Sequence, residues 1–139
     1  MKKIIVVFLA GFLSAISFAQ EKDSTVVEQV RINADLGVGQ DFLVDKTKIK
    51  FLGVISDSRC PKQVTCIWPG EAKVLLGIEL SGEYFEKEVV LSGGGAELAL
   101  SEVLQMQMTK LIPYPETAKG IAPEEYCLSF VAVLPQKDQ

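Results

Sequence analysis

Three cysteines, and the charged residues beside two of them, are the side chains of this sequence whose types and spacing could do chemistry. Cys60 and Cys66 stand six positions apart and follow Asp57 and Arg59 closely, whereas Cys127 lies far along the chain. The 139 residues include no histidine. Serine–histidine and cysteine–histidine catalytic pairs, histidine metal sites and an imidazole acid–base are therefore excluded.

Metal binding and thiol redox catalysis both favour a different spacing of cysteines. Structural zinc sites use closer cysteine pairs and four ligands, and redox sites typically have two residues between the cysteines. Met106 and Met108 could offer two thioethers to copper, but without histidine we interpret them as core residues. Nothing in the spacing of Asp57 and Glu71 supports a glycosidase-like carboxylate pair. We predict no enzyme activity, no cofactor and no metal.

The first nineteen residues are typical of a secretory signal peptide. Lys2 and Lys3 precede an apolar run over residues 4–18, and residues 17–19 match the small-x-small cleavage pattern. The run is shorter than the ~20 residues of a spanning helix. No cysteine lies near the cleavage point to carry a lipid. We predict an exported protein, periplasmic or extracellular, with no membrane span after removal of the signal.

The predicted mature chain is long enough for one domain and is acidic. Cleavage after residue 19 leaves 120 residues, enough for one hydrophobic core, with twelve basic and eighteen acidic side chains and a net charge of −6. This acidity argues against nucleic acid and anionic membrane surfaces as partners, because both reward clustered lysine and arginine. We expect a signal peptide over 1–19, a flexible tail over 20–28 and a single domain over 29–139.

Export also bears on whether the cysteines form a disulfide. In an oxidising compartment, two cysteines six apart on a turn-rich loop are well placed to pair, so we predict a Cys60–Cys66 disulfide. Closing so short a loop stabilises the fold by about 2 kcal/mol and stiffens the loop locally. Cys127 falls in an apolar stretch typical of a buried strand, which favours a buried free thiol. A pairing of Cys127 with either of the other two stays open.

The dominant hydrophobic period along the mature chain is two, which predicts strands. Turn signals separate these strands, and the longest connection runs from Pro113 to Glu125. Seven or eight short strands with such turns are typical of an all-β antiparallel sandwich or barrel. Six of the predicted strands have definite ranges, namely 30–34, 48–53, 74–80, 84–91, 104–109 and 125–134.

The most informative stretch joins two of these strands. It holds both of the paired cysteines and the only tryptophan, Trp68, and it contains a proline–glycine turn at 69–70. Arg59 can offer a forked donor to Asp57 or to Glu71. Trp68 can pack its face on the disulfide or on the end of the sandwich.

The order of residues in this stretch also resembles a known signature. Asp-Ser-Arg-Cys-Pro at 57–61, four further residues and Cys-x-Trp-x-Gly at 66–70 resemble the motif of a group of uncharacterised bacterial exported proteins and lipoproteins. The likeness covers roughly residues 28–134. It implies an immunoglobulin-like β-sandwich and no particular activity. This chain departs from the group at Pro69, where a small residue is expected, and in carrying Cys127.

These observations favour a non-catalytic exported envelope protein, either a structural module or one that binds another envelope or extracellular protein. Trp68 and Arg59 are candidate anchors, since such residues dominate interface hot spots. For Arg59 we favour a structural role, and for Lys62 and Gln63 partial exposure. The alternative is a protease-inhibitor-like module whose stiff Cys60 to Cys66 loop presents Lys62 or Gln63.

Overall fold

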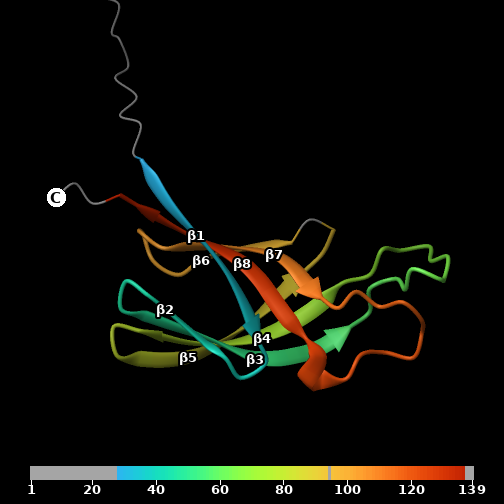
Figure 1. The fold of residues 1–139 in the computed structure, drawn as a ribbon. Helices are drawn as coiled ribbons and strands as arrows, with labels where there is room; N and C mark the ends of the chain where they lie inside the picture. The colour runs from blue at the N-terminus through green and yellow to red at the C-terminus, as the bar shows by residue number, and fades with distance from the viewer. Residues whose placement is uncertain (1–27, 94, 137–139) are drawn as a thin grey trace, which may run out of the picture.

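Residues 28–93 and 95–136 are described by the computed structural model, and they form two packed four-stranded antiparallel sheets (Figure 1). The predicted all-β antiparallel sandwich is confirmed. The predicted signal peptide, and the predicted tail except Glu28, lie outside the described residues. The strands are β1 Gln29–Gly37, β2 Asp41–Val44, β3 Thr47–Asp57, β4 Ala72–Leu80, β5 Glu83–Leu91, β6 Ala96–Ala99, β7 Gln105–Ile112 and β8 Cys127–Pro135, with one short 3-10 helix, η1 Pro123–Glu125, before β8.

All six strands that were predicted by range are present, as β1, β3, β4, β5, β7 and β8. The two strands without a predicted range, β2 and β6, have only four residues each. Four residues are too few to display a clear period of two. β6 also consists of Ala-Glu-Leu-Ala, whose alanines and glutamate have low strand propensity.

The core lies between the inward faces of the two sheets. Ile49 and Phe51 of β3 and Met106 and Met108 of β7 belong to this core, and all four side chains are buried, as the alternation predicts. The methionines are therefore packing residues. In β1 the alternation located the strand, but Val30 and Ile32 stay exposed, because β1 is an edge strand whose best-buried side chain is Leu36.

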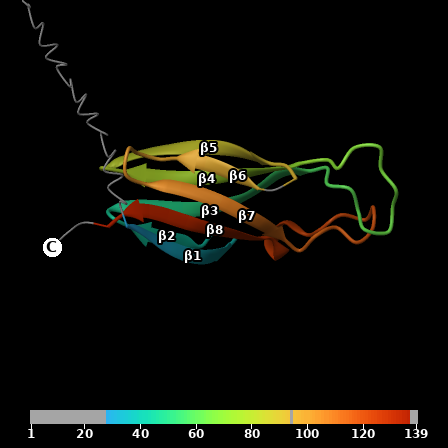
Figure 2. The same cartoon turned by 90° about the horizontal axis from the view of Figure 1, so that it is seen from above.

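Neighbouring strands within each sheet follow one another in sequence, except where β1 pairs with β8. An immunoglobulin domain instead pairs strands that are distant in sequence in both sheets. This protein therefore resembles the immunoglobulin fold in its two packed sheets but not in the order of its strands. In the β1–β8 ladder Gln29 faces Pro135 and Gly37 faces Cys127. The start of β1 and the end of β8 thus share one end of the sandwich, and two long loops project from the other (Figures 1 and 2).

Candidate functional site

The two projecting loops carry the motif residues. The first, here called the clamped loop, is residues 58–71 between β3 and β4, and the second, the adjacent loop, is residues 113–126 between β7 and β8. They extend side by side beyond the sheets (Figure 2). Two backbone hydrogen bonds join them, because the amides of Lys62 and Gln63 donate to the carbonyls of Pro115 (3.0 Å) and Glu116 (3.1 Å).

The base of the clamped loop continues the β3–β4 ladder. The Ser58 amide donates to the Glu71 carbonyl at 2.8 Å, and the Cys60 amide donates to the Pro69 carbonyl at 3.0 Å. Gly70 has a φ of +71°, and a Cβ at this position would overlap the Ser58 carbonyl. The sequence requires glycine here for both reasons, since a side chain would suffer strain and collision together.

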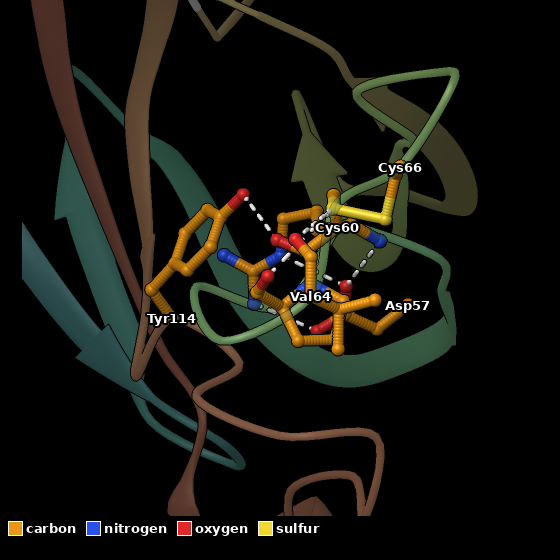
Figure 3. Close-up of a disulfide and its surroundings, with 7 residues drawn as sticks. Asp57, Cys60, Val64, Cys66 and Tyr114 are labelled. Atoms are coloured by element: carbon orange, nitrogen blue, oxygen red, sulfur yellow. Dashed lines mark hydrogen bonds and ion pairs between the residues drawn. A yellow bond between two sulfur atoms is a disulfide. The ribbon is translucent and has the colours of Figure 1, made fainter.

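The predicted disulfide between Cys60 and Cys66 is confirmed, with Cα atoms 5.9 Å apart (Figure 3). Cys127 is free, as expected, but it is half-buried rather than buried. Side chains alternate along β8, so that Leu128 and Phe130 enter the core and Cys127 takes the outer face. Burial, and then the charge of Asp35, raise the pKa of the Cys127 thiol.

Arg59 and Asp57 form a two-pronged ion pair at the base of the clamped loop. Arg59 Nε donates to Asp57 Oδ1 at 2.8 Å and Arg59 Nη2 donates to Asp57 Oδ2 at 2.7 Å. Only 11% of the arginine side chain and 9% of the aspartate side chain are exposed. Of the two predicted partners, the structure therefore selects Asp57. Glu71 instead lies 3.9 Å from the ammonium of Lys73.

The remaining donors of Arg59 hold the adjacent loop. Arg59 Nη1 donates to the Leu111 carbonyl at 2.6 Å, and Nη2 donates to the Pro113 carbonyl at 3.0 Å. The guanidinium also lies 5.0 Å from the ring centre of Tyr114. Each of these contacts joins the end of β3 to the end of β7. Arg59 is thus fully engaged inside the protein, which favours the structural role over that of a surface anchor.

Two tyrosines complete this cluster, and the sequence did not single them out as site residues. Tyr126 is buried and donates its hydroxyl to Asp57 Oδ2 at 2.9 Å, while Tyr114 donates its hydroxyl to the Cys60 carbonyl at 2.9 Å. Both flank or enter the long connection between β7 and β8. Tyr114 stands between two prolines and Tyr126 directly precedes the last strand, but the partners of both lie more than fifty residues away in sequence.

These contacts control the ionisation of the cluster. Burial by itself would raise the pKa of Asp57, but hydrogen bonds from Arg59 and Tyr126, together with the positive charge of Arg59, outweigh burial and lower it. Burial and the hydrogen bond to Asp57 raise the pKa of Tyr126 to about 12. At neutral pH the carboxylate is therefore ionised, and each of its oxygens accepts two hydrogen bonds. This leaves Asp57 poorly placed to act as a base.

Lys62 and Gln63 are exposed at the end of the clamped loop, as predicted. The Lys62 ammonium lies 2.7 Å from a carboxylate oxygen of Glu116, and about 60% of each side chain is accessible. This exposed pair has the same contact distance as the pair between Arg59 and Asp57. The two pairs differ in burial and also in geometry, because Arg59 makes two hydrogen bonds to Asp57 and Lys62 makes one to Glu116.

Trp68 does not pack as predicted. Its side chain is 78% exposed, and that of the neighbouring Ile67 is 91% exposed. The side chain that contacts the backbone of Cys60 is Tyr114, whose ring also lies against the guanidinium of Arg59. Trp68 instead lines a wide, open hollow with Pro61, Val64 and Tyr114.

The described residues contain no cluster of three or more histidine, cysteine or acidic side chains that could hold a metal ion. Among residues 28–93 and 95–136 there is also no helix of the length and hydrophobicity needed to cross a membrane. No family model, curated protein or solved structure matched this chain. The candidate site is therefore described by its geometry alone. The hydrogen-bonded cluster of Asp57, Arg59 and Tyr126 lies at the base of the clamped loop, and the exposed side chains of Ile67 and Trp68 lie further along that loop.

Proposed function

We propose that this protein is a non-catalytic, exported interaction module that contacts another envelope or extracellular protein through the clamped loop. The observation that carries this proposal is the exposure of Ile67 and Trp68 on a loop that is held by several independent constraints. Such exposure of large apolar side chains is unfavourable in water unless a partner covers them.

The rigidity of the loop supports the same proposal. The disulfide, the pair between Arg59 and Asp57, and the backbone bonds to the adjacent loop all fix the loop before any partner arrives. A fixed loop loses little conformational entropy on binding. Tryptophan is also over-represented among the residues that dominate interface energies.

Export of the protein is supported by the predicted signal sequence and by the disulfide. Disulfides persist in oxidising compartments and are rare in the cytosol. The acidic net charge suits a protein that avoids nucleic acid and anionic surfaces.

The protease-inhibitor alternative has weaker support. An inhibitory loop must offer its backbone to the protease, as an added strand does. The amides of Lys62 and Gln63 already donate to the adjacent loop, and the Lys62 ammonium is paired with Glu116. We therefore favour a contact through Ile67 and Trp68.

A binding comparison tests the proposed function. Mature protein is immobilised and exposed to envelope extract from its host, and retained proteins are quantified for wild type, Trp68→Ala and Leu43→Ala. Leu43 is a matched control, because it is 72% exposed on β2. We expect Trp68→Ala to retain at least about tenfold less of a specific partner than wild type does, because truncating a hot-spot residue weakens binding strongly. Its melting temperature should be unchanged. Equal retention by Trp68→Ala and wild type would contradict the proposal.

A further inference from the structure

The outer part of the clamped loop, residues 63–70, is electrically neutral. It contains eight consecutive uncharged residues, although the chain as a whole is acidic. The charges that flank it in sequence are paired within the chain, Lys62 with Glu116 at 2.7 Å and Glu71 with Lys73 at 3.9 Å, and Arg59 is paired with Asp57. A surface of this kind offers no charge to attract a charged partner. The complementary surface is therefore an uncharged one.

The backbone of the same segment is open as well. Within residues 28–93 and 95–136, the amides of Thr65, Cys66, Ile67 and Trp68 have no hydrogen-bond acceptor, and neither does the indole N–H of Trp68. Before this segment the Val64 amide donates to the Pro61 carbonyl, and after it the Glu71 amide donates to the Ser58 hydroxyl. Water must solvate these groups in the free protein. A partner that displaces this water has to supply acceptors, because an unsatisfied buried amide is costly.

The need for hydrogen-bond acceptors disfavours some classes of partner and favours one. The hydrocarbon of a membrane offers no acceptors to these amides. A second copy that met the first only at the tips would bury far less than the roughly 800 Å² per chain of a standard stable interface. An extended polypeptide segment supplies both apolar side chains and backbone carbonyls in a regular row.

We infer that the hollow beside Trp68 receives an extended, uncharged segment of another exported protein. The segment lies between Trp68 and Tyr114, covers Ile67, and accepts hydrogen bonds from the amides of residues 65–68. Pro61 and Val64 line the same hollow and add apolar contact. This inference rests on the proposed function and specifies the chemistry of its partner.

Site-specific cross-linking in the envelope of the host identifies what lies on the tip. The variant Ile67→p-benzoylphenylalanine is illuminated in cells, beside Leu43→p-benzoylphenylalanine as the control. We expect one discrete protein adduct at position 67 that is absent at position 43 and whose added mass is not that of a second copy. Mass spectrometry of the digested adduct should place the cross-link in a segment of at least five uncharged residues.

A synthetic peptide with the sequence of that segment is then titrated into purified mature protein. Trp68 is the only tryptophan, so its fluorescence reports on this site alone. We expect the emission to shift to the blue, and the affinity to change less than about twofold between low and high salt, since screening weakens only charge-driven contacts. Calorimetry should show at least about a tenfold loss of affinity for Trp68→Ala and none for Leu43→Ala.

Four results would overturn the inference. They are an adduct with a second copy, a blue shift on addition of phosphatidylcholine vesicles in place of peptide, an affinity that falls steeply with salt, and the absence of any adduct at position 67. The first three leave the clamped loop as a contact surface and remove only the proposed partner chemistry. The fourth, together with unchanged partner retention by Trp68→Ala, removes the proposed function too.

Discussion

Replacing Arg59 should destabilise this protein far more than replacing Lys62, although both side chains make ion pairs at 2.7 Å. Arg59→Ala removes the partner of an Asp57 side chain that is 9% exposed in the wild type, and leaves the Tyr126 hydroxyl as its side-chain donor. It also removes the donors to the Leu111 and Pro113 carbonyls. Removing one partner of a buried pair typically costs about 3–5 kcal/mol. We expect about 3 kcal/mol, because both side chains retain some contact with water.

Lys62→Ala is the matched control. Its pair is about 60% exposed on both sides, so solvent screening limits the loss to about 0.5 kcal/mol. For a domain of this size, each kcal/mol lowers the melting temperature by roughly 4 °C. The expected decreases are therefore roughly 12 °C for Arg59→Ala and roughly 2 °C for Lys62→Ala.

Urea denaturation of mature protein at neutral pH, followed by far-ultraviolet circular dichroism, measures these differences. The midpoint should fall while the slope stays constant. Asp57→Asn/Arg59→Ala should be more stable than Arg59→Ala, because the double variant no longer buries an unpaired charge. An Arg59→Ala curve that overlays wild type, or one that falls no further than that of Lys62→Ala, would refute the reasoning and return Arg59 to the candidate binding residues.

Three further predictions follow from the loop geometry. In urea denaturation, Gly70→Ala should lower the free energy of unfolding more than Gly82→Ala does. Both glycines have positive φ, but of the two only Gly70 would place a Cβ against backbone atoms, those of Ser58 and Arg59. Equal losses would show that the backbone at Ser58 moves aside at little cost. Cys60→Ser/Cys66→Ser should lower stability by about 2 kcal/mol and speed amide exchange in the clamped loop more than in the core, and uniform acceleration would contradict a local clamp. The hydrogen bond from Tyr126 stabilises the fold fully below the ordinary tyrosine pKa of about 10 and is lost as the pH rises towards about 12. The urea midpoint of wild type should therefore fall across that range, that of Tyr126→Phe should fall less, and parallel declines would refute the assignment.

Sequence reasoning located the features whose signals are local. The alternation of Met106 and Met108 with polar neighbours, the spacing of Cys60 and Cys66, and the proline–glycine turn all act within a few residues. The structure confirms the buried methionines and the disulfide, and Gly70 has the positive φ that was expected of it. Local patterns suffice here because strand alternation and short loop closure are themselves local constraints.

The expectations that failed depended on residues far apart in the chain. Trp68 was expected to pack on the disulfide or on the end of the sandwich, but it is exposed, and Tyr114, which stands forty-six positions later, contacts the Cys60 carbonyl. The contact between Tyr126 and Asp57 spans sixty-nine positions. Neither partner could be chosen without knowing that the β3–β4 and β7–β8 connections emerge side by side.

The pairing of β1 with β8 has a mechanical consequence. Both ends of the described chain leave the sandwich at the same end, so pulling them apart opens the ladder between Gln29 and Pro135 one residue pair at a time. When the force is applied instead between the termini and a partner bound to the clamped loop, it acts along the direction of the strands. Ladder hydrogen bonds are perpendicular to the strands, so many of them resist such a load together. The fold is therefore weak when its termini are separated and strong when it is stretched from its termini to its tip.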